Sequence, residues 1–492
     1  MILSTSKKPA INFGTAFDAG MNYLATNKTI GATAVDMASM VIPRTVIDTT
    51  RSPQAGVETF RREFSSCLLY LFVGGIGKLS GYTLSLLPKN KKYRAILPTI
   101  QAGQDSVEVF ANIWKKNLKN KNQINAYYTE IFKNTKGVSG NQKISINKNT
   151  CKDLASHMTS LMNCKHLDKK QKNILIQKIT NATGANESLI LSLGGKQITL
   201  KADELIDHSF HLANSFSSPK INKEFLKTKE IKDTPFIKSL KNFSKQKMLL
   251  GLGIVSAIAI SMQAVNRYLT KKKTGSDHFV GVESQNTIPK SPQEKKKEKA
   301  KFSTQKLLTT GAMLAFTTAT IGKFKDIPKK LEFTGSQPNL AQYKYIYGIT
   351  IAGRLLASRD KNELRETATR DVMGFSSWLI LGDIAAKSIA SIFEKKKGIS
   401  LLNNPNPNKT GIVKLLKSNL KNHSELVYAN KNTVGKSLSK AIEICPQKTK
   451  ESLKYLNLSQ LGGYLFSGIL LGVVIPVINK KITEKLSKKK EK

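Results

Sequence analysis

The feature that most constrains the fold is an uncharged stretch at residues 248–266, MLLGLGIVSAIAISMQAVN, with basic residues on both sides. A helix of about nineteen residues covers roughly 28 Å, which is close to the hydrocarbon thickness of a bilayer. Residues 455–479 form a second uncharged run near the C-terminal end of the chain, and a lysine-rich tail follows it. These two runs predict membrane-spanning helices.

Four weaker apolar runs lie at residues 64–87, 307–322, 345–352 and 374–393. Each is short or is interrupted by charge. Lys78 in the first run illustrates the difficulty, because a lysine at the bilayer centre costs about 3 kcal/mol unless it reaches the interface or faces other helices. Together the six runs predict an all-α, multi-pass helical membrane protein.

Composition limits the class of protein and its partners. The chain has 492 residues, of which 40% are hydrophobic, so sizeable polar segments must alternate with the buried spans. The net charge of +45 favours anionic partners, lipid headgroups above all. The lysines are spread through every polar stretch, so no specific nucleic-acid site is predicted. The four cysteines form no CxxC pair, and we expect no disulfide scaffold, metal or cofactor.

Shifts in composition divide the chain into segments. The polar region at 88–246 is predicted to be a mostly helical insertion domain, with a loop at 135–150 and a hairpin formed by Leu189 to Leu193 and Gln197 to Leu200. The other segments are N-terminal helices with a first span (1–87), a span (247–273), a disordered lysine-rich linker (274–300), a second membrane helix group (301–400), a polar helical segment (401–454), and a last span with a basic tail (455–492).

Three landmarks recur in the same order and suggest an internal duplication. Ile42-Pro43-Arg44 corresponds to Ala352-Gly353-Arg354, and Phe64-Ser65-Ser66 corresponds to Phe375-Ser376-Ser377. The third landmark is an asparagine-basic-x-apolar-threonine block, which begins at Asn266 and again at Asn479. Repeated halves are a familiar construction in transport proteins, although scaffold proteins duplicate too.

The candidate site residues lie within the apolar runs. Asp383 and Lys387 are four residues apart, so they share a helix face and are predicted to form an intramembrane ion pair. Small residues at four-residue spacing allow helices to approach closely in lipid. They predict tight contacts with other helices or with a second copy at Gly253, Ala257, Ser261, Gly468 and Gly472.

The remaining patterns argue against catalysis. The spacing of Cys151, His157, Cys164 and His166 is not that of a zinc site, and Glu204, Asp207, His208 and His211 fit ordinary pairing on a solvated helix. Gly435-Lys436-Ser437 ends like a phosphate-binding loop, but Asn430 stands where the first glycine is needed. We therefore predict that the chain is not an enzyme.

The block from Asn266 to Glu283, NRYLTKKKTGSDHFVGVE, together with the region from Pro43-Arg44 to Phe64-Ser65-Ser66, resembles lysine-rich membrane proteins of gut bacteria with AT-rich genomes. The resemblance covers about a fifth of the chain and brings no activity, cofactor or catalytic residue with it. It implies a bacterial inner-membrane location.

The function predicted from the sequence is that of a non-catalytic integral membrane protein, either a scaffold or assembly component or a transport component. The alternative is a soluble or peripheral lysine-rich helical protein that binds anionic lipid or nucleic acid. Basic residues flank the spans on both sides, so the positive-inside rule gives no orientation, and only the 274–300 segment is predicted to be cytoplasmic.

Overall fold

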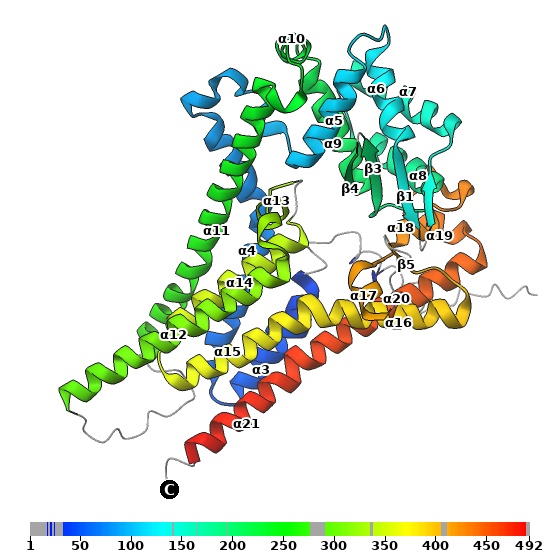
Figure 1. The fold of residues 1–492 in the computed structure, drawn as a ribbon. Coiled ribbons are helices and arrows are strands. Elements are labelled where there is room, and N and C mark those ends of the chain that lie inside the picture. The colour runs from blue at the N-terminus through cyan, green and yellow to red at the C-terminus, as the bar shows by residue number, and fades with distance from the viewer. Residues whose placement is uncertain are drawn as a thin grey trace, which may run out of the picture.

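Long helices dominate the computed structural model, which describes residues 17, 20, 21, 24, 33–139, 142–164, 166–193, 195–275, 291–334, 338–404 and 411–488 (Figure 1). The bundle consists of α3 (Ile42–Thr49), α4 (Pro53–Ser85), α11 (Pro235–Thr274), α12 (Pro292–Ile321), α14 (Leu340–Ala357), α15 (Lys361–Ser376), α16 (Gly382–Lys397), α20 (Gln447–Ile469) and α21 (Ile475–Lys488). Single π-helical turns precede α3 (η1, Met37–Val41), join α15 to α16 (η6, Ser377–Leu381) and join α20 to α21 (η8, Leu470–Val474). The chain is therefore mostly helical, as predicted.

Four helical stretches among the described residues are long and apolar enough to cross a membrane: Pro53–Ser85, Pro235–Thr274, Lys361–Lys397 and Gln447–Thr483. Only a third to a half of their most apolar windows is buried inside the molecule. Large apolar side chains that point outward from these helices include Leu71, Phe72, Leu79, Ile260, Val265, Leu465, Ile469 and Val473. Exposed apolar faces of this kind suit contact with lipid.

An insertion between α4 and α11 carries its own hydrophobic core. Its helices are α5 (Gln104–Lys116), α6 (Gln123–Lys133), α7 (Lys148–Asn163), α8 (Lys169–Thr183), α9 (Ala202–Phe216) and α10 (Pro219–Lys227), with short 3₁₀ turns at Pro88–Tyr93, Leu97–Thr99 and Ile231–Asp233. Buried aromatic rings fill the centre, where Trp114 lies edge-on to Tyr127 and tilted against Phe216. We call the residues 88–234 the first insertion.

A four-stranded antiparallel sheet lies inside the first insertion, with strand order β2-β1-β3-β4. The strands are β1 (Thr135–Ser139), β2 (Gln142–Ser145), β3 (Leu189–Leu193) and β4 (Lys196–Leu200). The predicted β3–β4 hairpin is confirmed, with Ile190 opposite Thr199. The prediction of a loop at 135–150 is wrong, because β1 pairs with β3, about fifty residues further along the chain, and α7 begins at Lys148.

A second, smaller insertion at residues 399–446 separates α16 from α20. It contains β5 (Leu402–Asn403), α17 (Gly411–Lys417), β6 (Asn419–Leu420), α18 (His423–Val427), a 3₁₀ turn (Lys431–Thr433) and α19 (Leu438–Ile444). Its Glu425 carboxylate accepts hydrogen bonds from the backbone N–H groups of Asn186 (2.6 Å) and Glu187 (3.0 Å) in the first insertion. The two insertions therefore meet at the same end of the bundle (Figure 1).

Two of the predicted segment boundaries need correction. Residues 292–300 are helical and not a disordered linker, because Ser291 caps α12 and Glu294 completes a capping box with it. Residues 276–290 of the predicted linker lie outside the described residues. The predicted span at 247–273 belongs to a longer helix, since α11 begins at Pro235, directly after the first insertion.

Candidate functional site

Charged side chains are buried together where α3, α4, α14 and α15 meet. Equal numbers of arginines and carboxylates take part: Arg44, Arg51, Arg62, Arg354, Arg359 and Arg370 with Asp48, Glu58, Glu63, Glu363, Glu366 and Asp371. We call this set the arginine–carboxylate network. Burying so many charges costs several kcal/mol per ion unless opposite charges and hydrogen bonds compensate them, so the pairing has to be nearly complete.

Four side chains of alternating sign form the centre of the network. Arg44 Nη1 lies 3.2 Å from Glu63 Oε1 and 3.6 Å from Asp371 Oδ1. Arg354 Nη2 lies 2.9 Å from Glu63 Oε2, and Arg354 Nη1 lies 3.1 Å from Asp371 Oδ2. Each arginine therefore touches both carboxylates, and each carboxylate touches both arginines. All four side chains are at most 1% exposed.

Two outer ion pairs cross between the helices in a reciprocal manner. Arg51, just before α4, lies 2.9 Å from Glu366 of α15. Arg359, just before α15, lies 2.6 Å from Glu58 of α4. These two pairs connect the residue just before α4 to the second turn of α15, and a residue just before α15 to the second turn of α4.

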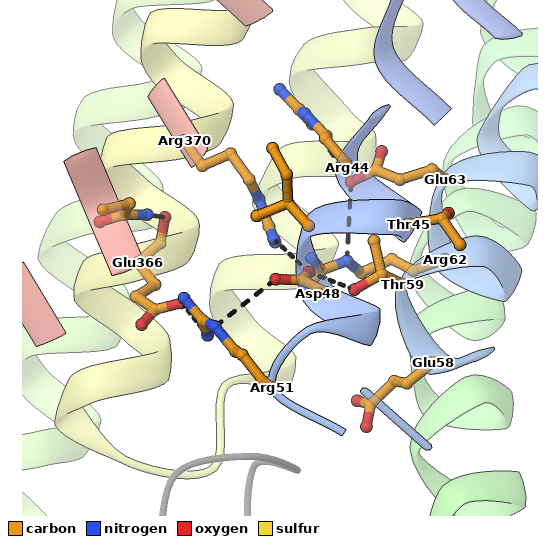
Figure 2. A network of polar contacts seen from close by, with 12 residues as sticks. Arg44, Thr45, Asp48, Arg51, Glu58, Thr59, Arg62, Glu63, Glu366 and Arg370 are labelled. Atoms are coloured by element: carbon orange, nitrogen blue, oxygen red, sulfur yellow. Dashed lines mark hydrogen bonds and ion pairs between the residues drawn. The ribbon is translucent and has the colours of Figure 1, made fainter. Parts of the chain in front are cut away.

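Asp48 of α3 gathers a further group of contacts (Figure 2). Its Oδ2 accepts a hydrogen bond of 2.6 Å from the Thr59 hydroxyl and lies 3.7 Å from Arg370 Nη1, while its Oδ1 lies 3.7 Å from Arg51 Nε. The short helix α3 is thus tied both to α4 and to α15.

One sequence pattern supplies most of these contacts twice. Arg51-Ser52 is followed after five residues by Glu58-Thr59-x-x-Arg62-Glu63, and Arg359-Asp360 is followed after five residues by Glu366-Thr367-x-x-Arg370-Asp371. Ser52 and Asp360 are the N-caps of their helices, each accepting a hydrogen bond from the backbone N–H three residues on. The caps start α4 and α15 at equivalent positions, so both patterns present the same side chains to the interface.

The predicted asparagine–threonine blocks join the same arrangement. Asn266 of α11 donates its side-chain N–H to the carbonyl of Glu58 (3.4 Å), and Asn479 of α21 does so to the carbonyl of Glu366 (2.8 Å). Thr270 accepts a hydrogen bond from Arg61, and Thr483 donates one to Glu366. The two asparagines therefore meet equivalent positions of the pattern, Glu58 and Glu366, whereas the two threonines contact different positions.

The sequence-based comparison found only part of this correspondence. It aligned Arg44 with Arg354, and these two arginines do share the centre of the network. It also aligned Phe64 with Phe375, which stand one and four residues after the corresponding carboxylates Glu63 and Asp371 and are therefore out of step with the pattern. The signal that could have revealed the network is the repeated pattern itself. In both copies an arginine is followed, at the same spacing, by Glu-Thr and then by an arginine with a carboxylate directly after it.

The chemistry of the network favours fastening over catalysis. Arginine stays protonated in proteins, so it is a poor general base. The carboxylates at the centre are held in ion pairs at 2.9 to 3.6 Å, so their oxygens already have partners within the protein. A buried network of this kind resists separation of the helices, because withdrawing one partner leaves an uncompensated charge.

The predicted intramembrane pair forms on α16, outside the network. Lys387 Nζ lies 2.5 Å from Asp383 Oδ2. Lys387 is buried, whereas the Asp383 side chain is 56% exposed. The aspartate of the pair is therefore accessible at the protein surface, whereas the lysine is enclosed by protein.

The predicted small-residue contacts divide into two kinds. Gly472 packs on η1 and α3, since a Cβ at Gly472 would lie 2.4 Å from the Ser39 carbonyl oxygen, and a Cβ at Gly468 would lie 3.1 Å from Ser39 Cβ. The stripe of Gly253, Ala257 and Ser261 lies instead on the exposed face of α11. A Cβ at Gly253 would meet nothing within 4 Å among the described residues, so the stripe makes no tight contact there with any helix that the structure describes.

The structure also places the weaker candidates for metal and nucleotide sites. Within the described residues no group of three or more histidine, cysteine or acidic side chains could hold a metal ion. His157 bonds Gln171 (2.8 Å), and Asp207 pairs with Lys172. The Gly435 N–H, which a phosphate would need, donates to the Gln177 side chain (2.7 Å).

The chain matches no protein-family model, no curated protein and no solved structure. The resemblance to lysine-rich membrane proteins of gut bacteria therefore stays a prediction.

Proposed function

We propose that the chain is a multi-pass integral membrane protein built from two related halves, and that it acts as a non-catalytic scaffold or assembly component. The observation that carries this proposal is the reciprocal clamp formed by the arginine–carboxylate network. Arg51 reaches Glu366 and Arg359 reaches Glu58, so the two halves hold each other by the same pair of contacts.

The order of elements supports the division into halves. The first half is α3, α4, the first insertion and α11, and the second is α14, α15 with α16, the second insertion and α20 with α21. The additional helix α12 runs back along the bundle, so that α14 starts at the end where the insertions lie. Both halves then run in the same direction, as in proteins whose repeats are related by an axis along the membrane normal.

The positions of the charges support a membrane-embedded bundle. The network lies just before the uncharged parts of α4 and α15, and Asn266 and Asn479 mark the same level on α11 and α21. Beyond that level the helices expose apolar side chains, as lipid contact requires. The two insertions meet at the opposite end, so we place them together on one side of the membrane and the 274–300 segment on the other, the cytoplasmic side.

Scaffolding suits the geometry better than transport. A transporter needs an interface that adopts two arrangements, whereas here the halves are fastened at one end by buried ion pairs and at the other by Glu425. Transport remains the second candidate because of the Asp383–Lys387 pair. If that pair lines a path, Asp383→Asn abolishes function without loss of protein, and a variant with normal abundance and a normal phenotype removes this candidate.

Alkaline carbonate extraction tests the membrane assignment. Membranes from cells that express the chain are washed at high pH, and we expect the protein to stay in the pellet, because the apolar faces of four helices hold it there. Release of most of the protein into the supernatant would refute the proposal and favour a peripheral lysine-rich protein that binds anionic lipid or nucleic acid.

A further inference from the structure

The segment between α12 and α14 enters the junction between the first insertion and the bundle. It contains a 3₁₀ turn at Phe324–Asp326 and α13 (Ile327–Lys330), and it continues to residue 334. Leu331 is buried against Met248 and Leu252 of α11. The segment therefore belongs to neither half, but it contacts α11 directly.

Phe333 acts as a wedge between α4 and α11. A Cβ at Gly77 of α4 would lie 2.4 Å from the Phe333 ring, and a Cβ at Gly251 of α11 would lie 2.6 Å from it. Only glycine leaves room for the ring on both helices. The side chain of Gln342 holds the neighbouring backbone by donating to the carbonyls of Leu331 and Glu332 (both 3.2 Å).

Glu332, next to the wedge, contacts the first insertion. Its Oε2 accepts the backbone N–H of Gln104 (3.0 Å) in the first turn of α5, while its Oε1 is buried without a hydrogen-bond partner in the described part of the chain. The residue is only 4% exposed. Lys329 adds an ion pair with Asp105 of α5 (3.0 Å), which is exposed to solvent.

We propose that residues 327–334 are a proton-sensitive latch, which docks the first insertion onto α4 and α11 while Glu332 is neutral and loosens when its carboxylate ionises. A buried carboxylate with one oxygen unpaired is costly when charged. Protonation removes the charge and leaves the hydrogen bond from Gln104 in place. Release would expose Glu332 to water and withdraw Phe333 from its two glycines.

The charge balance around Glu332 sets the direction of the response. The pKa of Glu332 is raised from an ordinary value of 4.5 to about 7, chiefly by burial and to a lesser extent by the neighbouring Asp105. The Gln104 N–H and Lys329 oppose this shift, but less strongly. Because the pKa is raised in the docked state, docking is favoured in full below about pH 4.5 and loses stability as the pH rises through about 7.

Hydrogen exchange in the full-length protein, measured by mass spectrometry in detergent micelles, tests the latch. After correction for intrinsic rates, we expect the peptide containing residues 327–334 to exchange about tenfold faster at pH 8 than at pH 6, which follows from the two pKa values. The core helix α9 should show equal protection at both pH values. Equal protection of 327–334 at both pH values would overturn the proposal.

Matched variants assign the effect to Glu332. Glu332→Gln cannot ionise, so residues 327–334 should stay protected and independent of pH, whereas the control Asp326→Asn, in the turn directly before them, should behave as the unaltered chain does. Gly251→Ala places a methyl group against Phe333, and exchange should be fast at both pH values. A Glu332→Gln protein that keeps the pH dependence, or a Gly251→Ala protein that stays protected, would refute the mechanism.

Discussion

Glu63 is one of the two carboxylates at the centre of the network, where it contacts both Arg44 and Arg354 and is fully buried. Glu63→Gln keeps the shape but leaves the two arginines to share Asp371. We expect this change to lower the free energy of unfolding by about 3–5 kcal/mol, the usual cost of leaving a buried charge uncompensated. Thermal or denaturant unfolding of the purified protein in detergent measures it.

The exposed Glu443 of the second insertion provides the control for that experiment. Glu443→Gln removes the same charge from a solvated position and should change stability by no more than about 0.5 kcal/mol. Equal effects of the two substitutions would show that the network does not fasten the bundle.

At the residue scale, sequence reasoning found a pair that is close in the chain but not the pairs that are distant. It predicted the Asp383–Lys387 pair because four residues of helix bring two side chains together. It did not predict the pair of Arg51 and Glu366, because 315 positions separate them and only the folded bundle brings them into contact. The repeated spacing shows which residues correspond between the two copies of the pattern, but tertiary structure decides which of them form ion pairs.

At the scale of elements, the reciprocal clamp makes a double-mutant prediction. Arg51→Glu places two carboxylates together, and Glu366→Arg places two arginines together, so each single change should be strongly destabilising. The double variant restores opposite charges, and its loss of stability should be smaller than the sum of the single losses by about 1–3 kcal/mol. Strict additivity of the two effects would mean that the pair does not couple the helices.

Two glycines allow the helix contacts to be tested by the same substitution. Gly472→Ala puts a methyl group 2.4 Å from the Ser39 carbonyl, so we expect a loss of about 1–3 kcal/mol from overpacking. Gly253→Ala meets open space, and it should be neutral or stabilising by up to about 1 kcal/mol, because alanine is the better helix former. The two unfolding midpoints decide the matter, and a reversed order would contradict the packing described for η8.

Elements were predictable where the signal is local. The uncharged runs at 248–266 and 455–479 do lie in helices, α11 and then α20 with α21. The strand β1 was missed because its sequence, Thr-Lys-Gly-Val-Ser, carries no apolar alternation, although one of its partners, β2, follows directly and only the other, β3, is remote. Gly137 in β1 packs against Thr183 at the end of α8, a contact that also depends on the folded insertion.

At the scale of the whole molecule, the suggested duplication predicts which side of the membrane each segment faces. The arrangement of the halves leads to the same prediction. Both insertions should lie on one side of the membrane, because Glu425 joins them, and the ends of α11 and α21 should lie on the other. Cys164 in the first insertion is exposed, while Cys67, Cys151 and Cys445 are buried, so the natural chain already carries one accessible thiol.

This arrangement can be tested by labelling intact cells with a membrane-impermeant maleimide. We expect Cys164 to react from outside, and so should a cysteine placed at the exposed Lys440 of the second insertion in a Cys164→Ser background. A cysteine at Lys272, on the last turn of α11 and exposed, should react only after the cells are opened, since about 30 Å of hydrocarbon separates it from the insertions. If the two insertion sites were labelled from opposite sides, the contact at Glu425 could not exist, and the parallel arrangement of the halves would be refuted. Labelling of all three from outside would place no bilayer between Lys272 and the insertions, which contradicts the spanning assignment of α11.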